Sequence, residues 1–284
     1  MTDKIIALVD GSTYAQSVCD HAAWVAERTG WAVELLHLLG RREGAETADY
    51  SGSIALGART ALLEELAELD AQRARLVTHR GRAILEDARA ILDRAGINEI
   101  TTRLRRGDIV ETVAEQEAGA EMILIGKRGE DADLARGHLG SNLERVVRAS
   151  RKPVFVAARA FKPIGRVLIA HDGGASAMRA VEHVARTPLY RGLEANVVTV
   201  GSASDAARKS LADAKAALDA AGITVKTDIV TGQPETALAK LVEEAPFDMV
   251  VMGAYGHSRI RSLIIGSTTT EMIRSCKVPI VLTR

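Results

Sequence analysis

The sequence has few of the residues that mark several common classes of protein. It contains only two cysteines, Cys19 and Cys276, which lie far apart and match neither a metal-binding nor a redox motif. Aromatic residues make up 3% of the chain, too few to expect a platform on which bases stack. The 37 lysines and arginines equal the 37 aspartates and glutamates, so the basic excess of a general nucleic-acid binder is missing. We therefore expect reduced cysteines and no nucleic-acid partner.

Long apolar runs are missing as well. None approaches the roughly 18 residues that a membrane-spanning helix needs, so we expect no membrane partner. The first four residues lead straight into a strand-like run, without the pattern of a signal peptide. These features predict a cytoplasmic protein. A chain of 284 residues, at roughly 150 per domain, is long enough for two domains.

The sequence contains an internal repeat. Asp10-Gly11 and Asp172-Gly173 each follow a short apolar run, and Gly140-Ser141 is matched later by Gly266-Ser267. The separation between matched positions falls from 162 to 126 residues along the chain, so the first half carries about 36 additional residues near residues 40–80. We predict two related domains, residues 1–159 and 164–284, joined by a short linker.

Each half alternates short apolar runs with stretches of helical periodicity. Runs of four to six apolar residues without strict alternation are typical of strands that are buried on both faces, as in a parallel sheet. Strand–helix alternation with short connections predicts α/β domains, each with a doubly wound sheet. The expected strands are 5–9, 33–38, 100–104, 122–125 and 154–157 in the first half, and 167–170, 197–200, 225–230, 249–252 and 280–282 in the second.

A glycine motif stands where such a sheet binds its ligand, beyond the carboxyl ends of the strands. Gly253 and Gly256 directly follow the fourth apolar run of the second half, and Gly266-Ser267 follow after nine more residues, at the start of a helix. Glycines let backbone N–H groups approach an anion, and a helix N-terminus adds free N–H groups and a favourable dipole. The motif predicts a phosphate site, although the chain has neither a Walker A loop nor a Gly-x-Gly-x-x-Gly fingerprint.

Asp172-Gly173 together with Gly-x-x-Gly-x9-Gly-Ser resembles the universal stress protein family, and two such units in one chain resemble its tandem subgroup. The resemblance implies a five-stranded parallel sheet in the order 3-2-1-4-5 in each half, with ATP, possibly accompanied by Mg²⁺, at the switch point. It also implies which residues of the second half bind the nucleotide, from the base and ribose to the phosphates: Asp172, Val200, Met252, Gly253, Tyr255, Gly256, Gly266, Ser267 and Thr268.

The first half departs from this pattern. Ten residues instead of nine separate its glycine pairs, and the intervening loop begins with three carboxylates, which repel phosphates. Lys127, Arg128 and Arg136 would offset part of this repulsion. We therefore expect a degenerate second site, with the matching residues Asp10, Gly126, Gly129, Gly140 and Ser141.

Several residues also have structural interpretations. Asp172 either binds a ligand or caps a helix, and an N-cap role of Ser267 is compatible with binding. His21 and His183 occupy matching helix positions and are expected to be packing or surface residues. Thr13-x-x-Gln16 matches a capping box, and Gly222 is placed to end a helix.

The additional segment contains an amphipathic stripe of leucines, Leu62, Leu66, Leu69 and Leu76. We expect this stripe to pack on its own domain, with a partner surface as the alternative. The residues upstream of it have little periodicity and are expected to form a loop.

The leading hypothesis is an ATP-binding stress-response protein with a regulatory role and at most slow hydrolysis. The alternative is a tandem scaffold that binds a protein or a small apolar ligand. The fifth strands, 154–157 and 280–282, would be short apolar sheet edges, which proteins usually cover. We therefore expect the two domains to pair through these strands as an internal pseudo-dimer. Association of two whole chains into a homodimer is an additional possibility.

Overall fold

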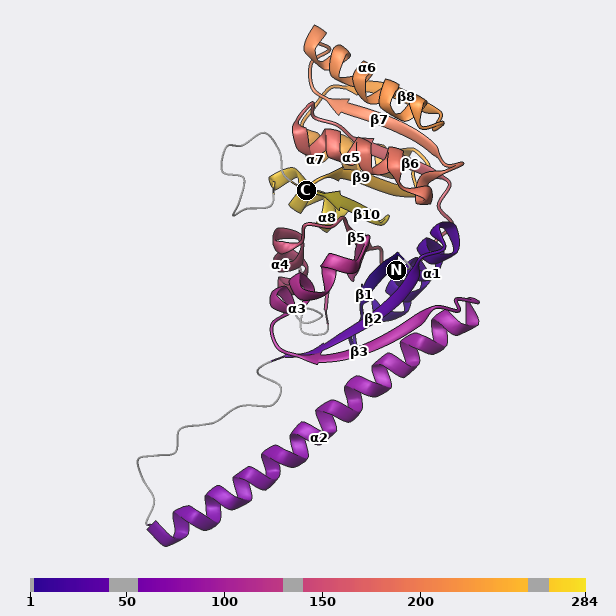
Figure 1. The fold of residues 1–284 in the computed structure, drawn as a ribbon. Helices are drawn as coiled ribbons and strands as arrows, with labels where there is room; N and C mark the ends of the chain where they lie inside the picture. The colour runs from indigo at the N-terminus through magenta and orange to yellow at the C-terminus, as the bar shows by residue number, and fades with distance from the viewer. Residues whose placement is uncertain (1–2, 41–55, 130–139, 255–265) are drawn as a thin grey trace.

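The computed structural model describes residues 3–40, 56–129, 140–254 and 266–284. Strands and helices alternate through both halves (Figure 1). The first half comprises β1 (Lys4–Leu8), α1 (Ala15–Thr29), β2 (Ala32–Leu39), α2 (Leu56–Arg94), β3 (Ile100–Arg106), α3 (Ile109–Gln116), β4 (Met122–Gly126), α4 (Ser141–Ala149) and β5 (Val154–Ala157). The second half comprises β6 (Arg166–Ala170), α5 (Ala175–Arg186), β7 (Glu194–Val200), α6 (Asp205–Ala220), β8 (Val225–Val230), α7 (Pro234–Glu244), β9 (Met249–Gly253), α8 (Ser267–Ser275) and β10 (Ile280–Thr283).

The strands form one ten-stranded sheet in the order β3-β2-β1-β4-β5-β10-β9-β6-β7-β8. Counted within each half, this order is 3-2-1-4-5, so the expected topology is confirmed. Neighbouring strands are parallel except β5 and β10, which are antiparallel. The two five-stranded sheets are therefore not separate, because their fifth strands join them.

The junction between the halves is made of apolar strands. Val156 lies opposite Ile280 and Phe155 lies opposite Val281 in the β5–β10 ladder, and all four side chains are fully buried. Each fifth strand alone would expose an apolar edge, which favours pairing with another strand. The pairing of the fifth strands into an internal pseudo-dimer is confirmed.

Helices cover both faces of the sheet. On one face, α1, α2, α5 and α6 pack on one buried apolar cluster, and on the other face α3, α4, α7 and α8 pack on a second cluster. Alternate residues of each buried strand contribute to the two clusters, as in Ile169 and Leu168 of β6. Within the described residues, no helix is long and apolar enough to cross a membrane.

Polar contacts beside β5 and β10 also hold the halves together. Arg28 Nε of α1 donates a hydrogen bond of 2.7 Å to the carbonyl oxygen of Leu189. Lys127, just after β4, donates to the carbonyl oxygen of Cys276. His21 is fully buried beside the junction, with its ring centroid 5.3 Å from that of Phe155. The packing role expected for His21 is therefore confirmed.

The helix boundaries test two local predictions. The capping box proposed at Thr13 is wrong, because α1 begins at Ala15 and its N-cap residue, Tyr14, makes no side-chain cap. Ser12 Oγ instead accepts a hydrogen bond from the backbone N–H of Tyr14. Gly222 lies just beyond α6 with φ +76°, a left-handed conformation that favours glycine, so its role at the end of this helix is confirmed.

The additional segment of the first half includes most of the 39-residue helix α2. Its C-terminal part packs on the sheet through buried Leu85, Ala88 and Leu92. The expectation that the leucine stripe packs on its own domain is wrong for two of its four positions, since Leu69 is 54% exposed and Leu76 is 71% exposed. The helix is longer than the face of the sheet it covers, so its N-terminal part projects beyond it (Figure 1). The loop expected upstream, residues 41–52, lies outside the described residues.

Candidate functional site

A cavity of about 410 Å³ lies at the carboxyl ends of the strands of the second half. At this place β6 and β9 are neighbours in the sheet, and the order of the strands reverses. It is lined by Ala170, His171, Asp172, Ala177, Val198, Val200, Pro234, Leu238, Met252, Gly253, Gly266, Ser267, Thr268 and Thr269. The structure thus brings together seven residues predicted from the sequence: Asp172, Val200, Met252, Gly253, Gly266, Ser267 and Thr268.

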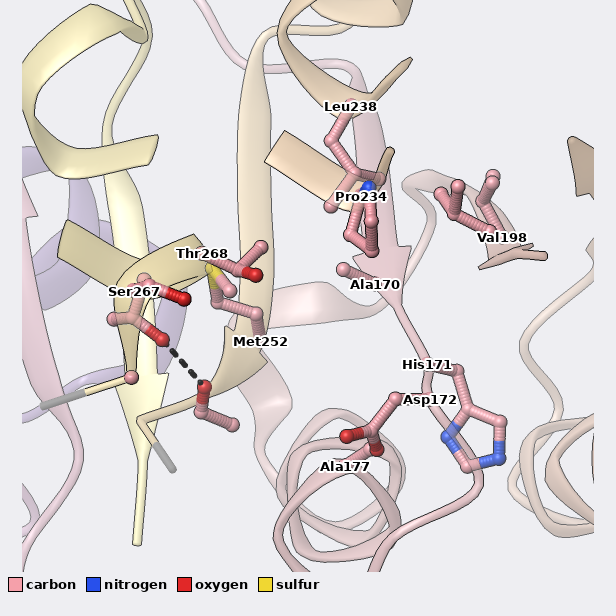
Figure 2. Close-up of a pocket in the computed structure, with 14 residues that line it drawn as sticks. Ala170, His171, Asp172, Ala177, Val198, Pro234, Leu238, Met252, Ser267 and Thr268 are labelled. Atoms are coloured by element: carbon pink, nitrogen blue, oxygen red, sulfur yellow. Dashed lines mark hydrogen bonds between the residues drawn. The ribbon is translucent and has the colours of Figure 1, made fainter. Parts of the chain in front are cut away.

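The cavity has a polar side and an apolar side. Figure 2 shows Ser267 and Thr268 at the start of α8 on one side, and Val198, Pro234 and Leu238 on the other. Val198 and Leu238 are buried, so their side chains form a dry wall. A cavity with one apolar wall and a few polar groups is typical of a small-molecule site.

The N-terminus of α8 forms the polar side. Its N-cap residue is Gly266, and its first turn contains no acidic residue, so a negative charge placed there would meet the helix dipole without competition. Thr269 Oγ1 donates a hydrogen bond of 3.3 Å to the carbonyl oxygen of Gly253, which fixes the start of α8 against the end of β9. The helix start is therefore held in place before any ligand binds.

Asp172 lies at the turn between β6 and α5. Its Oδ1 accepts a hydrogen bond of 2.8 Å from the backbone N–H of Gly174, the N-cap residue of α5. The bond closes a turn ahead of α5, but the helix-cap interpretation of Asp172 is wrong, because Gly174 is the N-cap residue and α5 has no side-chain cap. The carboxylate is exposed and also lines the cavity, so the structural role and contact with a ligand are compatible.

Gly253 allows the close packing of β9 and α5. A Cβ atom on this residue would lie 2.8 Å from the Cβ of Ser176 and 2.9 Å from its backbone carbonyl carbon. The backbone carbon cannot move as a flexible side chain can, so a larger residue would push the start of α5 away from the strand. The glycine that the motif supplies is thus needed for the wall of the cavity itself.

The sequence interpretation missed the other seven lining residues. Pro234 and Leu238 come from α7, which follows the third strand of this half, whereas the predicted residues follow its first, second and fourth strands. The proline directly after Gly232-Gln233 was the available signal, because proline is common at the first position of a helix.

His171 is the second missed residue of interest. Its ring points away from the polar side of the cavity, and Nε2 lies 2.8 Å from Ser210 Oγ of α6 (Figure 2). Burial lowers the pKa of this histidine below its ordinary value, so the neutral ring is favoured. His171 therefore packs the back of the site against α6.

Comparison with known proteins agrees with this geometry. The model of the Universal stress protein family matches residues 1–158 and 201–284. Universal stress protein Slr1230 of Synechocystis is 34% identical over 285 residues, and the match covers 99% of each chain. The chain belongs to the universal stress protein family.

Solved structures show the same fold. A universal stress protein from Archaeoglobus fulgidus superimposes with a TM-score of 0.73 at 20% identity, over 100% of this chain and 99% of the other. Protein PA1789 of Pseudomonas aeruginosa superimposes with a TM-score of 0.63 at 15% identity, over 99% and 92% of the two chains. The tandem arrangement of this universal stress protein thus recurs in other proteins.

The first half of this universal stress protein brings its motif together in a different way. A Cβ atom on Gly129 would lie 3.0 Å from Asp10 Oδ2, and one on Gly140 would lie 3.3 Å from the carbonyl oxygen of Lys127. Gly126 is packed against Tyr14, whose Cβ would lie 2.8 Å away from a Cβ on that glycine. The corresponding neighbour of Gly253 is the much smaller Ser176, so the two halves differ in the bulk beside the fourth strand.

The charges of the first half also differ. Lys127 does not serve the site, because it donates to the carbonyl oxygen of Cys276 in the other half. Burial lowers the pKa of Lys127, so its positive charge is held less strongly than usual. Glu144 lies in the first turn of α4, at which an anion would otherwise bind. All three features make this half of the universal stress protein less suited to an anion.

Some predicted residues cannot be placed. Tyr255 and Gly256 of the second motif, and Glu130, Asp131, Asp133 and Arg136 of the first, lie outside the described residues. Ser141 begins α4. In the part of this universal stress protein that the structure describes, no group of three or more His, Cys, Asp or Glu side chains could hold a metal ion.

Proposed function

We propose that the second domain binds ATP, or another adenine nucleotide, in the cavity between β6, β9 and α8. The observation that supports this proposal is the convergence of seven sequence-predicted residues, from four separate segments, on one cavity of about 410 Å³. This volume falls within the range of small-molecule sites. The chain belongs to the universal stress protein family, and the resemblance of its Gly-x-x-Gly-x9-Gly-Ser motif to that family implies the same ligand.

The two sides of the cavity suit the two ends of a nucleotide. The adenine would lie on the apolar side, against Val198, Val200 and Leu238, and the ribose would lie near Asp172. The phosphates would lie at the N-terminus of α8, where Gly266, Ser267 and Thr268 offer backbone N–H and hydroxyl donors. Any Mg²⁺ would then be held by the phosphates, together with water.

Binding and regulation, more than catalysis, fit the residues of the cavity. Asp172 is the one carboxylate among the described residues that line the cavity, and it is engaged by Gly174. His171 is directed toward Ser210 instead of toward the phosphate side. We therefore propose a regulatory or stress-resilience role, at most slow hydrolysis, and a cytoplasmic location.

Calorimetric titration with ATP, ADP, AMP and GTP tests the site. Asp172→Ala should weaken binding of the adenine nucleotides about tenfold or more, which corresponds to about 1.4 kcal/mol. Asp10→Ala is the matched control, because Asp10 makes the same turn in the first half, with Oδ1 3.1 Å from the backbone N of Ser12. Gly266→Val should abolish binding by covering the helix N-terminus. If both second-domain variants kept the wild-type affinity, the proposed site would be wrong.

A further inference from the structure

A second cavity, of about 640 Å³, lies at the junction of the two halves. Its walls come from the linker after β5, from the C-terminal end of α7 with the loop that follows, and from the segment between α8 and β10. The lining residues fall within 158–162, 239–248 and 275–279, and we call this space the junction cavity. Small-molecule sites occur preferentially at boundaries between domains, and this volume falls within their range.

The junction cavity is separate from the candidate nucleotide site. Asp248 directly precedes β9, Pro279 directly precedes β10, and Ala158 directly follows β5. Because β5 is antiparallel to β10 and β10 is parallel to β9, these three positions lie at one edge of the sheet. The cavity that contains Gly253 lies at the carboxyl ends of β6 and β9, which is the opposite edge. A ligand in the junction cavity would therefore not compete with the nucleotide.

One wall of the junction cavity is apolar. Val242 of α7 is buried, and Phe247 and Val278 are partly buried against the same apolar cluster. Cys276 is buried too, and burial raises the pKa of its thiol, so this side chain stays uncharged. The wall can thus bury the apolar part of a ligand, which is favourable in proportion to the apolar area removed from water.

The carboxylates that line the junction cavity already have partners within the chain. Glu243 Oε1 accepts a hydrogen bond of 3.1 Å from Lys277 Nζ. Asp248 Oδ2 accepts hydrogen bonds of 2.9 Å from the backbone N–H groups of Gly165 and Arg166. The negative charges of the lining are therefore balanced by donors of the protein.

Two helix ends add partial negative charge to the lining, because α7 and α8 both end here. The protein offsets part of this charge as well. The carbonyl oxygen of Ala245, the C-cap residue of α7, accepts a hydrogen bond of 2.8 Å from the backbone N–H of Phe247. The carbonyl oxygen of Cys276, the C-cap residue of α8, accepts a hydrogen bond from Lys127.

Two positive charges of the lining have no such partner. Arg159 and Lys162 line the junction cavity from the linker, and both are exposed. Among the residues that the structure describes, neither side chain takes part in an ion pair or a hydrogen bond. Each can therefore bind an anion without giving up a bond inside the protein. A guanidinium group matches a carboxylate with two parallel hydrogen bonds, and an ammonium group adds a point charge.

We propose that the junction cavity binds a small organic carboxylate with an apolar body. The carboxylate would pair with Arg159 and Lys162, and the apolar body would lie against Val242, Phe247 and Val278. The ligand would contact the linker and the second half at once. It would therefore add to the contacts that hold the two halves together.

NMR titration of the full chain with octanoate tests this site. Octanoate should bind at least about fivefold more tightly than 1-octanol, which lacks the charge, or inorganic phosphate, which lacks the apolar body. The double variant Arg159→Gln with Lys162→Gln should lose at least about fivefold in octanoate affinity. No octanoate binding at about 10 mM, equal affinities for octanoate and 1-octanol, or an unchanged affinity in the double variant would overturn the proposal.

A matched pair of cations provides the control for general charge effects. Arg208 and Lys209 on α6 are exposed and lie outside the lining of the junction cavity. Arg208→Gln with Lys209→Gln removes the same charge and should leave octanoate affinity unchanged. An equal loss in this variant would show that octanoate responds only to the net charge of the chain, which would contradict a specific site.

A spin label locates the bound ligand. Cys19 and Cys276 are buried, so a thiol-reactive nitroxide should attach to an added surface cysteine. On Ala160→Cys, at the junction cavity, the label should broaden the proton signals of octanoate. On Ala206→Cys, at the exposed start of α6, it should not. The opposite result would place the ligand elsewhere and overturn the proposal.

Competition with the nucleotide separates this site from the one proposed above. Saturating ATP should leave octanoate affinity unchanged, and so should Asp172→Ala, because the two cavities lie at opposite edges of the sheet. Displacement of octanoate by ATP would mean that both ligands use the cavity of the second domain, and the junction site would be wrong. If neither ATP nor Asp172→Ala had any effect because ATP does not bind, octanoate binding would still be measured by the linker variant.

Discussion

At the scale of single residues, three histidines that pack inside the fold link the stability of this protein to pH. His183 Nε2 lies 3.1 Å from the hydroxyl oxygen of Tyr190, and the two rings meet edge to face at 83°. Burial lowers the pKa of His183 to about 4. The pKa values of His21 and His171 are lowered for the same reason. All three rings are therefore neutral in the fold and must take up protons when the chain unfolds in acid.

The sign of the pH effect follows from this difference. Between pH 6.5 and 4 the unfolded chain binds a proton at residue 183 that the folded chain does not bind, so stability falls as the pH is lowered through this window. The loss due to this residue is up to about 3 kcal/mol. His183→Gln should reduce the difference between the unfolding free energies measured by urea at pH 7.5 and pH 4.5. An unchanged difference would show that His183 does not contribute to acid sensitivity.

At the scale of secondary-structure elements, α2 shows how one glycine sets the position of a long helix. A glycine in the middle of a helix lowers the stability of that helix by about 1 kcal/mol relative to alanine. Gly81 is kept where α2 crosses the sheet most closely, with His37 Cδ2 and Leu39 Cδ2 within 3.1 Å of where a Cβ would be. The helix can lie flat on β2 and β3 because residue 81 has no side chain.

Two leucine substitutions separate packing from helix propensity. Gly81→Leu should destabilise the protein by about 1–3 kcal/mol, because a large side chain has no room between the helix and the sheet. Ala83→Leu, two residues further on and exposed, should change stability by less than about 0.5 kcal/mol. Urea unfolding of both variants measures the effect. Equal stabilities would mean that α2 can shift away from the sheet without cost.

At the scale of the whole molecule, the continuous sheet makes one folding unit of two related halves. The side chains of β5 and β10 are buried at the junction in the middle of the sheet. The strands at the two ends of the sheet are β3 and β8. Arg284 Nη1 adds a hydrogen bond of 3.0 Å to the carbonyl oxygen of Arg148, across the halves. We therefore expect the halves to unfold together.

A lysine at the junction tests this coupling. Val156→Lys would place an uncompensated charge at a fully buried position and should destabilise the protein by several kcal/mol, with the single unfolding transition divided into two. Thr102→Lys, an exposed residue on β3 at the end of the sheet, should have little effect. Two transitions in the wild-type protein would show that the junction does not couple the halves.

The asymmetry of the halves predicts the stoichiometry. One nucleotide should bind per chain, because Tyr14 packs at the first glycine of the first motif and Lys127 is engaged by the second half. The number of sites in a calorimetric titration measures this directly. Two equivalent sites would contradict the expected role of Tyr14 and of the acidic loop.

The sequence by itself determined the fold class, the strand order through the family resemblance, and the second-domain motif. This was possible because buried strands, helix ends and glycine turns leave local signals. The apolar runs found in the sequence lie within one residue of the observed strands at most ends, and the largest difference is at β7, which starts at Glu194 instead of Val197. Asp172 lies at the cavity because it follows the end of β6, and Gly266 because it precedes the first residue of α8.

Only the tertiary structure decided which residues meet across long distances in the chain. The contact of Tyr14 with Gly126, the withdrawal of Lys127 to Cys276 and the wall formed by α7 depend on packing between segments that have no common local pattern. The same holds for α2, whose amphipathic stripe is equally compatible with its own sheet and with a partner. Leu69 is exposed on the part of the helix beyond Ala74, whereas Leu76 is exposed between Ala74 and Thr78 because it lies on the side turned away from the sheet.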